Sequence, residues 1–303
     1  MAKRKGKSRK RKQKSRHHRP KQVHTGSLYL EYSGKSHVRA NKLESFRRHL
    51  DLELAVQRDR VIDFLYNTLS ENCATFNFSE WVRVVSTQFS NDPLSTEGSL
   101  RSVGGRFNFG RIDDAQFTPF RCLYVASDRH VGLSEYLQRN PDETEEGITA
   151  AELNLLTQNP SFFGISGNLQ HVLNITNGSS LTGFLNLIKG FKIPDFVNEM
   201  ADKLDIERPK VITKLDELMS QLLDANFKYF ANFLNVPSNS QWFGQICFTA
   251  GIEAIVYPSV RGKGDCLAIF PENFLSHESY VELIDAPPNV FNRRIEGPQL
   301  LTR

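Results

Sequence analysis

Two stretches of the chain repeat apolar side chains at intervals of three and four residues, the spacing of a helix that buries one face. Residues 43–71 form the first stretch and predict one or two amphipathic helices. Residues 207–234 form the second stretch, which opens on Arg208 and Pro209. Because proline is favoured in the first turn of a helix, the second stretch predicts one continuous helix, the clearest in the sequence.

Short apolar runs bounded by turn-forming residues predict strands. Residues 76–89 read FNFSEWVRVVSTQF and residues 120–128 read FRCLYVASD, and each run predicts one strand. Asp128 then stands at the N-cap position of a short helix, which Pro141 ends. A strand, a turn and a helix are therefore expected in that order.

The second half of the chain contains a further ordered set of elements. Residues 242–270 predict a helix, a strand at 254–257, a polar turn at 258–265 and a second strand at 266–270. Glycines alternate with small apolar runs in residues 141–200, which predict mixed short strands and loops.

Charge is divided unevenly along the chain. Residues 1–22 contain 12 Lys or Arg and no acid, so the net charge of +4 leaves 26 basic and 34 acidic residues in the remainder. Such a basic run predicts a disordered arm that attracts nucleic acid through its charge. A nonspecific, solubilising arm and specific recognition both stay open, since only His17, His18 and His24 near the run offer rings for stacking on bases.

Missing patterns exclude several classes of protein. No stretch approaches the roughly 20 apolar residues that cross a membrane, and no apolar region of a secretory signal follows the basic run, so we expect a cytoplasmic protein. The four cysteines lack the spacing of a disulfide framework or a zinc site, which predicts reduced thiols. HExxH and the Cys/His spacings of metal sites are absent, so the sequence predicts no metal site. The glycine-rich patterns GxGxxG and GxxxxGK are also absent, which excludes a Rossmann or P-loop motif.

Four motifs invite a joint interpretation. They are Arg83 in WVRVV, Arg106 in GGRFN, the pair Tyr124 and Glu135 in LYVASDRHVGLSEY, and Ser259 in VYPSVRG. Each motif is weak by itself, but their order and spacing form a specific combination. The combination resembles the RES domain family, the toxins of a group of bacterial toxin–antitoxin systems, over roughly residues 76–140 and 240–275.

The resemblance implies both an activity and a fold. Members of the family consume NAD+ by phosphorolysis or hydrolysis on a fold similar to that of ADP-ribosylating toxins. We therefore expect an α/β (α+β) protein with a split mixed β-sheet, NAD+ and phosphate as substrates, no cofactor, and an antitoxin as a possible protein partner. Arg83, Arg106, Tyr124, Glu135 and Ser259 correspond to the conserved pocket residues of the family.

The resemblance also divides the chain. We expect a basic tail at 1–25, a helical extension at 26–75, a catalytic domain at 76–285 and a C-terminal tail at 286–303. The catalytic domain has an insertion at about 141–240, which contains the predicted long helix and is longer than the family pattern.

The predicted site residues suit NAD+ chemically. Arginine grips phosphate oxygens with a planar fork, which fits Arg83 and Arg106 to the pyrophosphate. The Tyr124 ring suits the nicotinamide. The Glu135 carboxylate would bind ribose hydroxyls and stabilise the positive charge that develops at C1′ when the glycosidic bond breaks. Ser259 is not in a nucleophile elbow, so we assign it to hydrogen bonding of phosphate or ribose, with Arg261 as a second phosphate contact.

Ordinary structural roles stay open for the same residues. Arg106 fits a tight surface turn, Tyr124 a core position, Glu135 a solvated helix face and Ser259 a turn. Two other functions stay open as well. The first is an ADP-ribosyltransferase that uses the same pocket to modify a protein or nucleic acid. The second is a noncatalytic RNA-associated protein that binds through the basic tail.

Overall fold

Two helices open the described part of the protein, as residues 43–71 predict. The computed structural model describes residues 34–138 and 159–297, so the predicted basic tail at 1–25 lies outside the described residues. The helices are α1 (Gly34–Asp59) and α2 (Ile62–Ser70). Among the described residues, no helix combines the length and the apolar character needed to cross a membrane.

Seven strands of the described chain form one mixed sheet. They are β1 (Cys73–Ser86), β2 (Leu123–Ala126), β3 (Pro160–Asn174), β4 (Ala254–Pro258), β5 (Asp265–Ile269), β6 (Tyr280–Ile284) and β7 (Arg294–Glu296). Their order is β1-β2-β5-β4-β3-β6-β7, and β3 with β4 is the parallel pair among otherwise antiparallel ones. The expected mixed α/β class is therefore correct.

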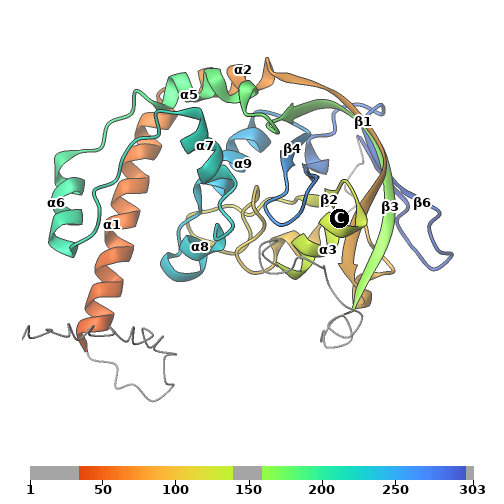
Figure 1. Ribbon diagram of the computed structural model, residues 1–303, viewed down its shortest axis with the longest axis horizontal. Helices are drawn as coiled ribbons and strands as arrows, with labels where there is room; N and C mark the ends of the chain where they lie inside the picture. Colours follow the sequence, from red (N-terminus) through yellow and green to blue (C-terminus); the bar gives the residue numbers. More distant parts are fainter. Residues whose placement is uncertain (1–33, 139–158, 298–303) are drawn as a thin grey trace, which may run out of the picture.

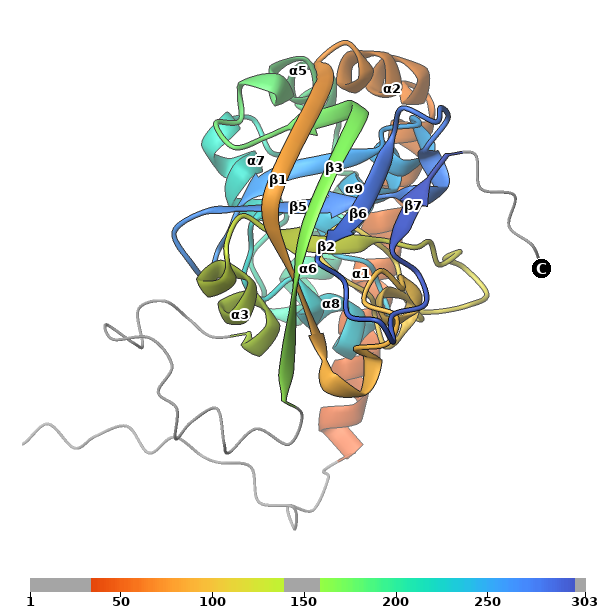
Figure 2. The ribbon, with the colours of Figure 1, turned by 90° about the vertical axis from the view of Figure 1, so that its right-hand side faces the viewer.

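The sheet closes on itself. β1 also pairs with β3 along most of its length, so β1, β2, β5, β4 and β3 form a barrel-like ring, with β6 and β7 added beyond β3. Figure 2 shows the long pair β1 and β3 crossing over β2 and β5. We expected a split sheet, and the structure has a closed ring of five strands in its place. The likeness to ADP-ribosyltransferases stays a prediction.

Alternate residues of the central strands enter two apolar cores. Leu267 and Ile269 of β5 join a core shared with β1, β3 and β6, whereas Cys266 and Ala268 join a core shared with helices. This alternation follows from side chains pointing to opposite faces along a strand. Figure 1 shows α2, α5, α7 and α9 gathered on the helix-bearing side. Tyr124 also packs on that side, which positions the candidate site there.

The remaining helices of the described chain are α3 (Arg129–Leu137), α5 (Thr182–Ile188), α6 (Asp195–Leu204), α7 (Leu215–Leu222), α8 (Lys228–Leu234) and α9 (Asn239–Thr249). Asp128 caps α3 by accepting the Val131 N–H at 2.9 Å, as the sequence predicts. The run at 242–270 also has its predicted order in α9, β4 and β5.

The continuous helix expected over residues 207–234 is wrong. Helix α7 begins only at Leu215, and the chain leaves the helix after Leu222 before α8 begins. The main-chain oxygens of Leu222 and Asp224 accept hydrogen bonds from Arg106, and the Asp224 side chain accepts from the Asn226 N–H in a tight turn. These bonds replace those of another helical turn, so the periodic pattern is interrupted.

The predicted insertion at about 141–240 needs a second correction. Its residues 160–174 form β3, which pairs with β1, β4 and β6 at the centre of the sheet. Gly167 is required there, because a Cβ would overlap the Phe78 ring and the Tyr280 carbonyl. Glycines at such close approaches made this strand resemble loops. The expected tail at 286–303 likewise contains β7, whereas residues 139–158 and 298–303 lie outside the described residues.

Candidate active site

A cavity of about 600 Å³ lies beside β1, β2 and α3, and residues from distant parts of the sequence line it. Four of the predicted site residues are on its wall: Arg83, Arg106, Tyr124 and Glu135. Its volume falls within the usual range for small-molecule sites.

The loop that carries Arg106 is held in place by one buried amide. The Asn108 Oδ1 accepts the Gly105 N–H and the Tyr124 hydroxyl, both at 2.9 Å. Its Nδ2 donates to the main-chain oxygens of Ser99, Phe109 and Phe120. Asn108 is fully buried, so losing it would leave several main-chain groups without partners. The loop is therefore rigidly attached to the strand that carries Tyr124.

Both glycines of the GGRFN motif are required by this packing. Gly104 has a main-chain φ of 90°, a conformation that residues other than glycine rarely adopt. A Cβ at Gly105 would overlap the Tyr124 ring, so the close approach here is to the tyrosine. In the described chain, Gly105 therefore lets the loop approach Tyr124.

Tyr124 is fixed through its hydroxyl. The hydroxyl accepts the Phe107 N–H at 2.9 Å and donates to Asn108. Burial raises the pKa of Tyr124 well above its ordinary value, and the neighbouring Cys122 adds to the shift. The phenol is therefore neutral at physiological pH and acts as a positioned donor and ring.

Arg106 is buried to 4% exposure and joins two parts of the fold. Its Nη1 donates to the main-chain oxygen of Asp224 at 2.7 Å and to that of Leu222 at 3.2 Å. Its guanidinium also lies 4.8 Å from the centre of the Phe227 ring. Arg106 thus lines the cavity while it holds the end of α7.

Arg83 lines the cavity but is strongly engaged by the main chain. Its Nη1 donates to the Tyr124 carbonyl oxygen at 2.7 Å and its Nε to that of Pro93 at 3.3 Å. Burial lowers the pKa of Arg83 to about 10, so it keeps its charge at neutral pH. These bonds fix the guanidinium against β2.

Glu135 is oriented by a residue more than a hundred positions away. Ser259 Oγ donates to Glu135 Oε1 at 2.6 Å and accepts the Arg261 N–H at 3.1 Å. Arg261 Nε lies 4.0 Å from Glu135 Oε2. Ser259 and Arg261 are outside the cavity wall, and Arg261 donates to Gln138 and to the Ala225 carbonyl oxygen. In this arrangement Ser259 positions the carboxylate, and its contact with phosphate or ribose stays a prediction.

Comparisons with known proteins give one structural likeness to report. No protein-family model matches the chain, and no curated protein matches it. A crystal structure of the M. tuberculosis MbcT–MbcA toxin–antitoxin complex contains a similar chain, with 15% sequence identity and a TM-score of 0.37. The match covers 73% of this chain and 90% of that chain.

Two further cations line the cavity that the sequence did not single out. Arg101 stands on the loop before Gly104, and Lys228 opens α8. Burial lowers the pKa of Lys228, and the nearby charges of Arg261 and Arg106 lower it further. Lys228 therefore brings a second positive charge close to Arg106 on the cavity wall. No local motif marks Lys228, since it reaches the site only through the turn after α7.

The cavity also contains two thiols, Cys122 and Cys266. Burial raises the pKa of each thiol above its ordinary value, so both are protonated at neutral pH and are weak nucleophiles. Among the described residues, no group of three or more His, Cys, Asp or Glu side chains is arranged to hold a metal ion.

Proposed function

We propose that the protein degrades NAD+ by cleaving the bond between nicotinamide and ribose, with phosphate or water as the acceptor. The observation that carries the proposal is the placement of Glu135 on the wall of the cavity that Arg106 and Tyr124 also line, with Ser259 holding the carboxylate. These residues come from separate motifs and have complementary chemistry for one substrate.

The charges of the cavity match the parts of NAD+. Arg106, Arg101 and Lys228 concentrate positive charge where a pyrophosphate needs it. The fixed ring of Tyr124 offers a face or edge to the nicotinamide. Glu135 supplies the negative charge of the site. Ser259 holds its Oε1, and we assign Oε2, which lies 4.0 Å from Arg261 Nε, to ribose hydroxyls or to C1′.

The reaction follows from these positions. The bond between C1′ and the nicotinamide nitrogen breaks, and its electron pair neutralises the positively charged ring, so the leaving group needs no proton. The positive charge that develops at C1′ is stabilised by the Glu135 carboxylate. A phosphate oxygen then bonds to C1′ to give ADP-ribose 1″-phosphate, or water bonds there, releases a proton and gives ADP-ribose.

Turnover of NAD+ by the purified protein tests the proposal. Nicotinamide and the ADP-ribose product are followed by chromatography with and without phosphate. We expect Glu135→Gln to lower kcat by about a hundredfold, because the neutral amide cannot stabilise the developing charge. Glu199→Gln is the matched control, since Glu199 is an exposed helix acid on α6 that pairs with Lys203.

Three outcomes would contradict the proposal. The first is a folded wild-type protein that releases no nicotinamide, and the second is a Glu135→Gln variant with full turnover. The third, with NAD+ labelled in its ADP-ribose part, is label that stays bound to protein or nucleic acid. The last outcome would indicate ADP-ribosyl transfer.

Growth inhibition is the cellular part of the proposal. Expression of the wild-type protein should lower cellular NAD+ and arrest growth, whereas Glu135→Gln should do neither. An antitoxin would then be a protein whose co-expression restores both growth and NAD+. Growth arrest by Glu135→Gln equal to that of wild type would separate toxicity from NAD+ and overturn this part.

A further inference from the structure

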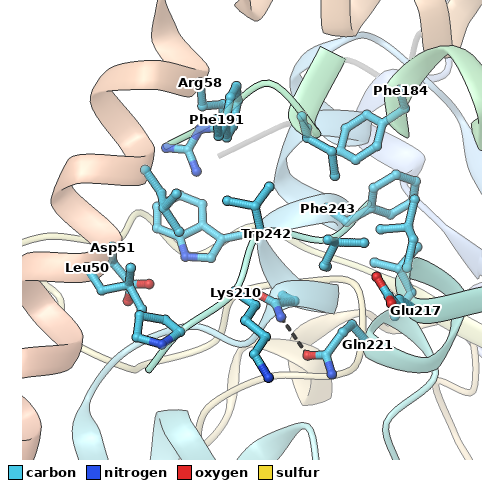
Figure 3. A pocket seen from close by; sticks show the side chains of 18 of the residues that line it. Leu50, Asp51, Arg58, Phe184, Phe191, Lys210, Glu217, Gln221, Trp242 and Phe243 are labelled. Atoms are coloured by element: carbon cyan, nitrogen blue, oxygen red, sulfur yellow. Dashed lines mark hydrogen bonds between the residues drawn. The ribbon is translucent and has the colours of Figure 1, made fainter. Parts of the chain in front are cut away.

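A second cavity, of about 630 Å³, lies between α1, α7, α9 and the segment 209–213. It shares no lining residue with the candidate active site. Its deep side is apolar and includes Phe184, Phe243 and Ile246. Figure 3 shows Trp242 at its centre, between Arg58 and Asp51 of α1 on one side and Gln221 of α7 on another.

Arg58 is a half-buried cation of this cavity whose guanidinium makes no hydrogen bond to another described residue. Its guanidinium carbon lies 4.1 Å from the centre of a Trp242 ring, and its nearest carboxylate is that of the exposed Asp59, at 3.8 Å. Burial lowers the pKa of Arg58 more than the surrounding acids raise it. Within the described residues, no side-chain or main-chain acceptor bonds to its guanidinium. An acidic ligand would supply that missing partner.

Asp51 is an acceptor two helical turns before Arg58, on the same face of α1. Its Oδ1 lies 3.7 Å from Arg47 Nε, and its Oδ2 is buried without a hydrogen-bond partner among the described residues. Burial raises the pKa of Asp51 to about 6, although Arg47 and Arg58 lower it. A buried carboxylate oxygen without a donor is costly, so a ligand N–H or O–H would stabilise this end of the cavity.

We infer that this cavity binds a small aromatic acid that also carries a hydrogen-bond donor. The ring lies among the apolar side chains beside Trp242, the acid group meets Arg58, and the donor meets Asp51. Charge complementarity selects this class, because the half-buried Arg58 guanidinium has no hydrogen-bond acceptor among the described residues and its ion-pair partner, Asp59, is exposed and 3.8 Å away. The inference is independent of the proposed NAD+ cleavage.

The position of the cavity connects it to the candidate active site. Leu218, Gln221 and Leu222 of α7 line it, and the Leu222 carbonyl accepts from Arg106 on the other side. Trp242 also packs edge-on against Phe109, which follows the Arg106 loop. An occupant of this cavity therefore lies against the elements that hold Arg106.

Binding of 8-anilinonaphthalene-1-sulfonate tests the inference, since this probe has aromatic rings, an acid group and an N–H donor. The chain contains two tryptophans, so Trp81→Phe leaves Trp242 as a reporter inside the cavity. We expect saturable binding of one probe per chain, with energy transfer from Trp242. Unlabelled 4-aminobenzoate should displace the probe, whereas its methyl ester, which lacks the acid, should not.

Variants in the Trp81→Phe background locate the acid group. Arg58→Gln should weaken probe binding about tenfold, through loss of a charge-assisted hydrogen bond. It should leave the affinity for N-phenyl-1-naphthylamine, the same rings without the acid, unchanged. Arg208→Gln is the matched control, because Arg208 is exposed, bonds to Asp202 and adjoins the lining residue Pro209.

Several results would overturn the inference. They are the absence of energy transfer from Trp242, displacement by the ester as strong as by the acid, and an Arg58→Gln variant that keeps full affinity for the sulfonate probe. The displacement measurement uses unsubstituted Arg58, so it decides the question even if Arg58→Gln does not fold.

Discussion

At the scale of single residues, a few buried polar side chains determine the structure and the charge of the two cavities. Asn108 is fully satisfied, with two donors and an acceptor engaged, and it fixes the loop on which Arg106 stands. Asp51 is the opposite case, because burial leaves one of its oxygens without a partner in the described chain. The first residue stabilises the fold, whereas the second costs stability when it is charged.

Asp51 therefore predicts a pH-dependent stability. Burial raises its pKa from 3.8 to about 6 in the folded protein, so its stabilising contribution is full below about pH 3.8 and is lost as the pH rises through 6. Asp51→Asn cannot lose a proton. Relative to wild type, the variant should gain about 1.4 kcal/mol in free energy of unfolding between pH 5 and pH 8.

Urea unfolding of both proteins at the two pH values measures this difference. Other titrating groups are common to both proteins and cancel in the comparison. A difference in free energy of unfolding that is the same at pH 5 and pH 8 would contradict the prediction.

At the scale of elements, the candidate site depends on how α3 begins and where α7 ends. Asp128 starts α3 and so sets the direction in which Glu135 leaves the helix. Arg106 donates hydrogen bonds to the carbonyl oxygens of Leu222 and Asp224 at the end of α7. The chain turns there, and Lys228 follows on the cavity wall. Each element end thus positions one charge of the site.

Replacing the cap of α3 should affect both stability and the candidate site. Asp128→Ala removes the acceptor of the Val131 N–H and should cost about 1 kcal/mol of unfolding free energy. It should also lower NAD+ turnover, because the helix that carries Glu135 frays. Asp128→Ser, which keeps a capping oxygen, should restore most of both losses.

Urea unfolding and nicotinamide release measure the two effects on the same preparations. An Asp128→Ala variant as stable as wild type would show that the cap does not hold α3. Failure of Asp128→Ser to recover stability would assign the loss to another role of Asp128.

At the scale of the whole molecule, the closed ring brings together charges from separate parts of the chain. Arg106 comes before β2, and Lys228 opens α8. Burial of a cation without an anion is unfavourable, and the lowered pKa of Lys228 reflects that cost. We therefore expect the candidate site to favour an anionic ligand.

Inorganic pyrophosphate should for this reason stabilise the folded protein. At about ten times its dissociation constant, a ligand that binds only the folded state adds about 1.4 kcal/mol of unfolding free energy. Lys228→Gln should reduce the stabilisation, and added salt should weaken it. Lys189→Gln is the matched control, since the Lys189 amine bonds to Asn186 outside the cavity.

Thermal unfolding at several pyrophosphate concentrations measures the effect. Equal stabilisation of the Lys228→Gln variant and the control would show that Lys228 does not contact the anion. Absence of any stabilisation of wild type would remove pyrophosphate recognition from the candidate site.

Local features of the fold were predictable because their causes are near neighbours in sequence. The apolar spacing of residues 43–71 predicts α1 and α2, and the order of α9, β4 and β5 follows from one continuous pattern. The Asp128 cap acts across three residues, so its signal is also local. β3 was not predictable in the same way, because its glycines resemble those of a loop. Gly167 is required by its close contact with Phe78 and Tyr280, which are distant in sequence.

The sequence alone determined the mixed class of the protein, α1 and α2, the order of α9, β4 and β5, and the motifs that carry Arg106, Tyr124, Glu135 and Ser259. The tertiary structure alone decided the pairing of β1 with β3, the end of α7 at Arg106 and the bond from Ser259 to Glu135. It also decided the second cavity, where Arg58 meets Trp242. The physical reason is range: helix periodicity and caps act within a few residues, whereas these contacts join positions that become neighbours only when the chain folds.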